Sequence, residues 1–252
     1  LLRYPVRTVE LGIQSTSDTV LEQSGRGHTA RDSEKACHAV LNAGLELVGQ
    51  MMIGLPGSTA ETDRQTACDL AAFGVTGARI YPTVVFAGTP LADLTATGRY
   101  MPLTLADAVN RSADAYEILD RYGIRCLRIG LCASEELTDP RCALAGPNHP
   151  ALGEMVLGEV RFRELLRMIR EAGLLGRRVA LEVPEAHISQ TVGQRRCNLI
   201  RLQEEYGTTV VSVTGVRERL VPSVQPAESS EKENICCVSE ITGNAGLQIL
   251  SR

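Results

Sequence analysis

Apolar segments alternate with amphipathic ones over the first half of the chain. Residues 9–14 (VELGIQ) and 47–53 (LVGQMMI) have the apolar character of strands. Residues 29–44 lie between them, repeat apolar side chains at helical spacing and end at a glycine. The order strand, helix, strand predicts a βαβ unit with parallel strands.

The same alternation continues beyond this unit. Residues 58–74 predict a helix, 77–86 a strand, 105–122 a helix and 124–131 a strand. The candidate N-caps of the first two helices are Thr29 or Asp32 and Ser58 or Thr59. The fold class is therefore α/β with a parallel sheet, and its strands are too few to close a barrel.

The second half of the chain has a different order of elements. Residues 133–150 are rich in proline and glycine and predict a loop, and residues 151–172 predict a helix. A strand at 179–183, two short helices at 184–192 and 198–206, and a strand at 209–213 give a β-α-α-β order. We expect four segments: a core at 1–131, a loop and connecting helix at 132–178, the β-α-α-β segment at 179–222, and a flexible tail at 223–252.

Composition narrows the class of protein. The 252 residues are 44% hydrophobic and 22% charged, as in ordinary globular proteins. A net charge of -4 gives no global attraction to nucleic acid or membrane, and no apolar run approaches the roughly 20 residues of a membrane span. We therefore expect no membrane partner and a cytoplasmic location. The chain begins at Leu1, and we expect it to be part of a longer one.

Polar side chains occur where the predicted strands end. The sequence has two amides near these ends, those of Gln14 and Gln50. It also has the guanidinium of Arg26 and the hydroxyls of Tyr81 and Thr83 there. The carboxyl ends of parallel strands are where α/β folds hold ligands, and these groups suit a ligand with an amino-acid end and a ribose. The alternative is that Gln14 and Gln50 cap strand ends and Arg26 is solvated; the pattern by itself favours that alternative.

A series of motifs in one order changes this weighting. The chain resembles the radical S-adenosylmethionine superfamily, and within it the radical domain of the Elongator catalytic subunit family. The resemblance spans residues 6–131 and rests on residues 9–15, GRGHT at 25–29, GLPG at 54–57, IYPT at 80–83, GT at 88–89 and GRY at 98–100.

This resemblance implies part of a (β/α)6 TIM-type barrel that holds S-adenosylmethionine on a 4Fe-4S cluster, where reductive cleavage gives a 5'-deoxyadenosyl radical. Gln14 and Arg26 match cofactor-contacting residues, and Val84 and Val85 match the strand that flanks the adenine. Gln50 stands where the oxygen-independent coproporphyrinogen oxidase branch has an aspartate directed to the ribose. An electron donor such as ferredoxin or flavodoxin is implied for the intact enzyme, and no catalytic residue is assigned.

The cluster ligands of that family are missing from this sequence. No three of the eight cysteines have the Cys-x3-Cys-x2-Cys spacing, so we expect that loop upstream of Leu1 and no turnover by this chain alone. Cys126, Cys132 and Cys142 with His149 lack the short cysteine pair of most metal sites, so no metal ligands are assigned. His28 suits a structural hydrogen bond.

The β-α-α-β segment suggests a second function. Residues 188–202 resemble a KH module, in which a Gly-x-x-Gly loop between two helices clamps a nucleic-acid backbone. Gly193 matches the first glycine and Arg196 stands at the second. Arg195, Arg196 and Arg201 are candidate phosphate contacts. RNA binding and simple packing are both left open by the sequence.

The favoured function is an Elongator-like radical S-adenosylmethionine enzyme that acts on tRNA or another RNA. No acetyltransferase-like stretch follows Leu131, so acetyl transfer is not expected of this chain. Two alternatives stay open: an enzyme of the oxygen-independent coproporphyrinogen oxidase type, and a non-catalytic RNA-binding or scaffold protein.

Overall fold

The computed structural model describes residues 4–217 and 221–227. The chain divides into two compact units, Leu1–Val160 and Arg161–Arg252. The sequence predicts boundaries after residues 131 and 178, on either side of a connecting segment. The structure has one boundary instead, between Val160 and Arg161, and it falls inside helix α7 (Leu152–Glu171). Each unit has its own core and its own sheet.

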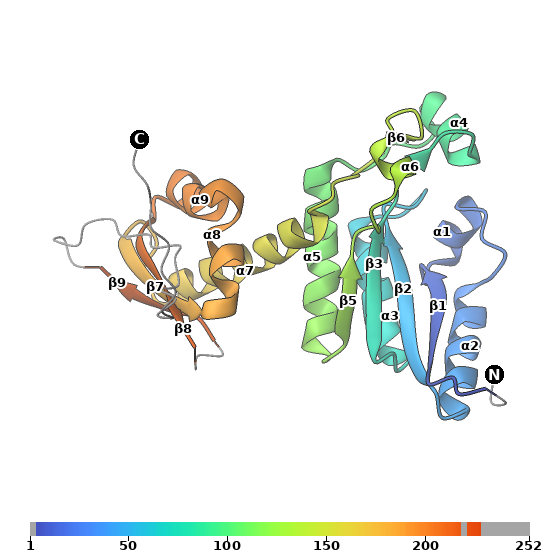
Figure 1. Cartoon of the computed structure of the whole chain (residues 1–252), viewed down its shortest axis with the longest axis horizontal. Coiled ribbons are helices and arrows are strands. Elements are labelled where there is room, and N and C mark those ends of the chain that lie inside the picture. Colours follow the sequence, from blue (N-terminus) through green and yellow to red (C-terminus); the bar gives the residue numbers. More distant parts are fainter. Residues whose placement is uncertain (1–3, 218–220, 228–252) are drawn as a thin grey trace, which may run out of the picture. The chain divides into compact units, whose positions relative to one another are not determined.

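The first unit is built on a parallel sheet of four strands (Figure 1). The strands are β1 (Thr8–Gln14), β2 (Glu46–Ile53), β3 (Gly77–Pro82) and β5 (Arg125–Ile129), in the order β1-β2-β3-β5. Every neighbouring pair is parallel, as the alternation of elements predicts. The α/β fold class is therefore confirmed.

Two of the helices begin at capping boxes that the sequence indicates. Thr29 caps α2 (Ala30–Asn42) together with Asp32, and Thr59 caps α3 (Ala60–Ala72) together with Thr62. In each case the cap side chain accepts a backbone N–H that has no partner within the helix. This unit also contains α1 (Asp18–Gln23), α4 (Pro90–Ala96), α5 (Leu105–Arg121), α6 (Glu135–Thr138) and the first part of α7.

One face of the sheet carries the core of this unit. Alternate strand residues such as Ile13, Met51 and Ile80 are buried against α2, α3 and α5. The residues between them point to the opposite face, where Glu10, Gln50 and Arg79 gather. Gln50, one of the polar groups that the sequence places near the strand ends, therefore lies on this side of the sheet beside Glu10 and Arg79.

The predicted strand at 77–86 is wrong beyond Pro82. The backbone N–H and the hydroxyl of Thr83 both donate to the carbonyl of Ile53, at the end of the pairing between β2 and β3. The following β4 (Val85–Phe86) pairs antiparallel with β6 (Ala143–Ala145). The region 133–150, expected to be a loop, thus contains both β6 and the short helix α6.

The second unit has a β-α-α-β core, as predicted. It contains β7 (Arg178–Pro184), the 3-10 turn η1 (Glu185–His187), α8 (Ile188–Val192), the 3-10 turn η2 (Gln194–Arg196), α9 (Cys197–Tyr206) and β8 (Thr209–Val216). β7 and β8 are parallel, and both helices pack with them around Leu181, Leu202 and Val213.

The prediction of a tail from residue 223 onward is wrong at its start. Residues Ser223–Pro226 form β9, which pairs antiparallel with β7 and completes the sheet order β8-β7-β9. Only Val224 of this strand packs on the core, so its sequence has no alternating pattern to indicate a strand. The rest of the expected tail, residues 228–252, lies outside the described residues.

Candidate functional site

A cavity of about 480 Å³ lies at the carboxyl ends of β2 and β3. Its walls come from the segment after α1, the end of β2, the turn that follows β2, the segment after β3, and α4. Arg26 and Val84, both candidate cofactor contacts, line it together with Met52, Leu55 and Leu91. Glu22 lines it as well, and a cavity of this size with one guanidinium, one carboxylate and mainly apolar walls suits a small amphipathic ligand with a charged end.

Arg26 is exposed and has no ion-pair partner in the described part of the chain. Its backbone N–H donates to the carbonyl of Leu21, which fixes the loop after α1. Its Nη2 lies 3.5 Å from the Sδ of Met52, at the end of β2. The guanidinium is therefore held at the cavity while its charge remains available to a carboxylate.

Gln14 ends β1 with a positive φ of 66°, which is rare for a residue other than glycine. The residue is only 8% exposed, and its side chain folds back over Gly12. A methyl group on Gly12 would lie 2.5 Å from the Nε2 of Gln14 and 4.0 Å from the Oε1 of Gln50. The two candidate glutamines therefore converge above Gly12, which leaves room for them because it has no side chain.

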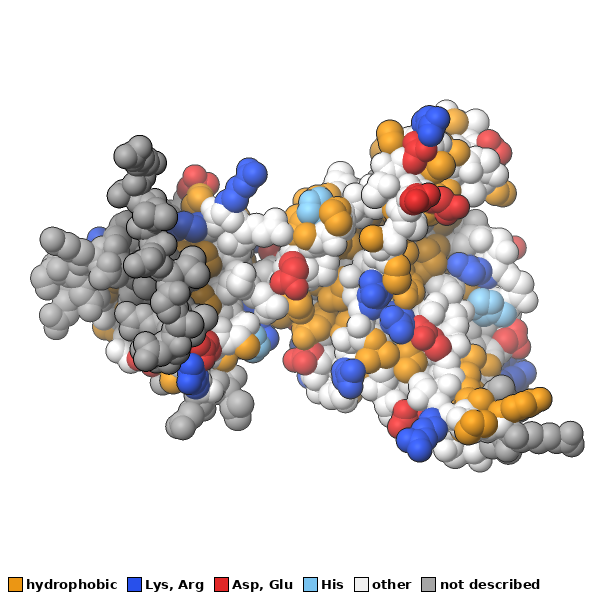
Figure 2. Space-filling view, in the orientation of Figure 1, with side chains coloured by type: hydrophobic (Ala, Val, Ile, Leu, Met, Phe, Trp, Pro, Cys, Tyr) orange, Lys and Arg blue, Asp and Glu red, His pale blue; other side chains and the backbone are white. Residues whose placement is uncertain are grey.

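Gln50 already has a partner within the protein. Its Nε2 donates to the Oε1 of Glu10 at 2.5 Å, and the same oxygen lies 2.6 Å from the Nε of Arg79. Figure 2 shows basic and acidic side chains among hydrophobic ones on the viewed face of this unit. Glu10 is thus a site residue that sequence reasoning missed, although it shares the strand face of Gly12 and Gln14.

Val84 and Val85 are both buried but differ in position. Val84 lines the cavity, whereas Val85 is fully buried, belongs to β4 and does not line it. Of the five candidate cofactor contacts, the structure brings Arg26 together with Val84 and Gln14 together with Gln50. Arg26 contacts Met52, which lies two residues after Gln50 on β2 and on the same strand face. The cavity therefore lies next to the face that carries Gln50.

The remaining candidates have structural partners. The Nε2 of His28 lies 3.3 Å from the carbonyl oxygen of Ile13, so the expected structural hydrogen bond is confirmed. The Nδ1 of His149 accepts the backbone N–H of Ala151 just before α7. Burial raises the pKa of the Cys126 thiol to about 11, so this thiol is protonated at neutral pH. Within residues 4–217 and 221–227, no group of three His, Cys, Asp or Glu side chains is placed to hold a metal ion.

The segment Gly193–Arg196 in the second unit has an unusual backbone. Gly193, Arg195 and Arg196 all have positive φ, at 74°, 51° and 64°. Arg196 thus adopts the left-handed conformation that glycine favours, at the position where the Gly-x-x-Gly pattern has its second glycine. Both arginines are exposed, and neither has an ion-pair partner among the described residues. Arg201 instead pairs with Glu205 at 3.0 Å and stacks 3.9 Å above the ring of Phe162.

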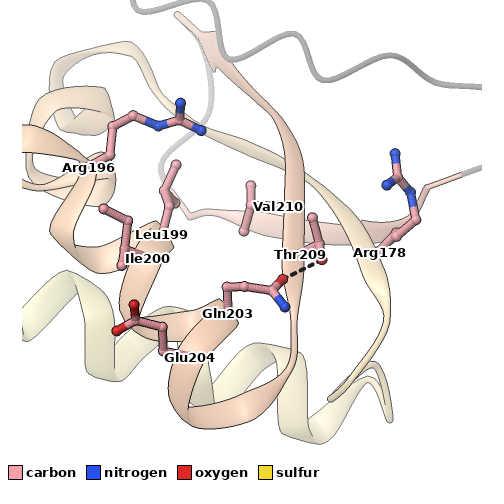
Figure 3. Close-up of a pocket in the computed structure, with 8 residues that line it drawn as sticks. All are labelled: Arg178, Arg196, Leu199, Ile200, Gln203, Glu204, Thr209 and Val210. Atoms are coloured by element: carbon pink, nitrogen blue, oxygen red, sulfur yellow. Dashed lines mark hydrogen bonds between the residues drawn. The ribbon is translucent and has the colours of Figure 1, made fainter.

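A groove of about 450 Å³ begins beside this segment (Figure 3). Leu199, Ile200 and Val210 give it an apolar floor, and Arg196 and Arg178 stand at its edges. Gln203 is held by a hydrogen bond with the hydroxyl of Thr209, so its orientation is fixed. Glu204 lines the groove as well, so the groove offers an apolar surface for a flat ring, with two guanidinium groups and one carboxylate around it.

Comparison with known proteins agrees with the motif series. Residues 75–161 match the Radical_SAM C-terminal domain. The predicted resemblance to the radical S-adenosylmethionine superfamily and its Elongator branch is confirmed. Elongator complex protein 3 of Danio rerio is 36% identical over 117 residues, which are 44% of this chain and 21% of that protein. A protein of Methanocaldococcus jannaschii named tRNA uridine(34) acetyltransferase is 31% identical over 132 residues, 51% of this chain and 24% of its own.

A solved structure extends the likeness to most of the chain. The archaeal Methanocaldococcus infernus Elp3 with N-terminus deletion (1-46) covers 74% of this chain with a TM-score of 0.56 and 26% identity. This chain corresponds to 41% of that one, and it spans only about a quarter or less of the curated relatives named above. No helix in the described ranges is both long and apolar enough to cross a bilayer.

Proposed function

We propose that this chain is part of an Elongator-like radical S-adenosylmethionine enzyme and that the cavity at the ends of β2 and β3 binds the cofactor. The observation that carries the proposal is the meeting of Arg26 and Val84 in one cavity at the carboxyl ends of parallel strands. The residues fit the group: the guanidinium and apolar walls of the cavity match its carboxylate and adenine, and the amides of Gln14 and Gln50, on the adjoining strand face, match its polar ribose.

Each residue has a distinct role in this proposal. Arg26 binds the carboxylate of the amino-acid end, and Val84 packs against the adenine. Gln14 and Gln50 orient the ribose, and Gln50 is itself held by Glu10. When bound to a 4Fe-4S cluster, S-adenosylmethionine supplies a 5'-deoxyadenosyl radical on one-electron reduction. Four further features remain predictions. They are the cluster ligands, a ferredoxin or flavodoxin as electron donor, the partial (β/α)6 barrel of the intact enzyme, and a cytoplasmic location.

The test is anaerobic iron-sulfur reconstitution of the full-length gene product, followed by an assay for 5'-deoxyadenosine. Arg26→Ala should weaken S-adenosylmethionine binding by about tenfold or more, since a charged hydrogen bond is worth roughly 1.5–3 kcal/mol. Calorimetry measures this directly, and Arg31→Ala, which alters an arginine outside the cavity, is the control. Unchanged affinity in Arg26→Ala would remove Arg26 from the site.

The second unit supports a role in RNA binding, and we propose tRNA or another RNA as the partner. The exposed, left-handed Arg195 and Arg196 beside an apolar groove favour this over simple packing. The relatives carry names of Elongator and tRNA-modifying proteins, which favours this substrate class over the coproporphyrinogen oxidase alternative. A full-length protein without the three-cysteine loop would instead favour the non-catalytic binding protein.

The RNA proposal has its own test. Changing Arg195 and Arg196 together to Ala should weaken retention of tRNA at low salt and reduce the salt dependence of binding, because two phosphate contacts are lost. Arg167→Ala, which removes an exposed arginine of α7 that does not line the groove, is the control. Equal retention by the double variant and the wild type would leave the segment a packing element.

A further inference from the structure

A network of three largely buried side chains surrounds the turn that follows β2. The Oη of Tyr100 donates to the carbonyl of Gly54 at 2.6 Å, and the carboxylate of Asp63 accepts the backbone N–H of the same glycine. Both polar groups of Gly54 are therefore held by side chains from outside the turn. Gly54 itself has a φ of 76°, and Leu103 packs where a side chain would begin.

Arg111 joins the two ends of the turn. Its Nε donates to the Oδ2 of Asp63 at 2.8 Å, and its Nη2 donates to the hydroxyl of Ser58 at 2.9 Å. The side chains of Asp63 and Arg111 are only 5% and 12% exposed. Burying this ion pair costs desolvation free energy, so the pair is weak evidence for stability and better explained by a need for a fixed geometry.

The other side of the same turn faces the cavity. Leu55 and Pro56 line the cavity that Arg26 also lines, whereas the network contacts Gly54 and Ser58 on either side of them. Gly57 has a φ of 75° and lies against the side chain of Gln23, another lining residue. The position of the turn thus fixes two parts of the cavity wall.

We infer that Asp63, Arg111 and Tyr100 are positioning residues for the cofactor cavity. Their side chains hold the turn at residues 54–58, and none of the three lines the cavity itself. The inference rests on the proposed function, because it takes the cavity to be the S-adenosylmethionine site. Tyr100 suits this role because it is only 8% exposed and keeps its proton to donate to Gly54.

The test uses Tyr100→Phe in the full-length, anaerobically reconstituted protein. This variant keeps the ring and removes only the hydroxyl, so the carbonyl of Gly54 loses its partner. We expect faster hydrogen exchange in residues 54–58 and a five- to tenfold weaker affinity for S-adenosylmethionine in calorimetry. Arg111→Lys should retain more affinity than Arg111→Met, because it keeps a donor beside Asp63 and Ser58.

Two controls separate positioning from general loss of stability. Ile124→Val removes one methyl group from the same core away from the turn, and Glu61→Gln breaks the exposed pair with Arg64 on α3. Both should leave affinity unchanged. Faster exchange in Tyr100→Phe with wild-type affinity would overturn the inference while the cofactor site stands. Failure of the wild type itself to bind S-adenosylmethionine would overturn the proposed function and the inference with it.

Discussion

The two units place non-glycine residues in a left-handed backbone for different purposes. Three such residues occur among those described, namely Gln14 in the first unit and Arg195 and Arg196 in the second. All three are candidate site residues from the sequence. Gln14 is buried and its side chain is fixed against Gly12, whereas the two arginines are exposed. Each such conformation costs about 1–2 kcal/mol, so the strain is informative where it occurs.

The difference concerns how a ligand would be recognised. In the first unit, the strained backbone at Gln14 and the hydrogen bond from Gln50 to Glu10 hold side chains in place, as suits a small ligand with fixed donors and acceptors. In the second, the strain bends the backbone between α8 and α9 and leaves two long cations in solvent, as suits a phosphate backbone. We expect the first site to respond to changes in the core and the second to salt.

The largest expected effect concerns the pH dependence of the first unit. Burial raises the pKa of Asp63 from 3.8 to about 6, which outweighs the opposing effect of Arg111. The folded state then binds a proton more tightly than the unfolded state, so this group's stabilisation is full below pH 4 and is lost as the pH rises through 6.

Urea unfolding of the wild type and of Asp63→Asn should therefore diverge between pH 4 and pH 7. The free energy of unfolding of the wild type should fall by about 2–3 kcal/mol relative to the variant over this range. The network around Gly54 would then be pH-sensitive. Parallel pH profiles for the two proteins would show that Asp63 has an ordinary pKa.

A smaller effect is expected from Arg196→Gly in the second unit. Glycine adopts the left-handed conformation without cost, so the variant should be more stable by about 1 kcal/mol in thermal unfolding. Arg201→Gly, in the interior of α9, is the contrast and should be destabilising.

RNA binding by Arg196→Gly sharpens the comparison further. Weaker tRNA retention would show that the arginine side chain contacts the RNA, which is the expected result. Stronger retention would mean that the backbone itself approaches the phosphates and that the side chain at 196 obstructs it.

The smallest effect on stability is expected for Gly12→Ala. The added methyl group would meet only the far end of the long Gln14 side chain, which can turn aside, so the free energy of unfolding should change by less than about 1 kcal/mol. The side-chain amide resonances of Gln14 should nevertheless shift in NMR spectra, and S-adenosylmethionine affinity should fall. Gly27→Ala, which adds a methyl group in open space, is the matched control and should change neither.

The sequence by itself determined the local elements of this protein. Periodicity and capping residues such as Thr29 and Thr59 located the helices, because these signals act within one or two turns. Motif order indicated Arg26 and Val84, which do meet in one cavity. The β-α-α-β order of the second unit was also readable from hydrophobic pattern alone.

Only the tertiary structure decided which distant side chains meet. Asp63 and Arg111 are separated by 48 residues and Tyr100 and Gly54 by 46, so no local pattern pairs them. Gln50 reaches Glu10 because β1 and β2 pair in parallel with a fixed register. Residues 223–226 form β9 because they pair with the edge of β7. Local propensity acts over a few residues, whereas these contacts depend on how the whole sheet brings remote segments together.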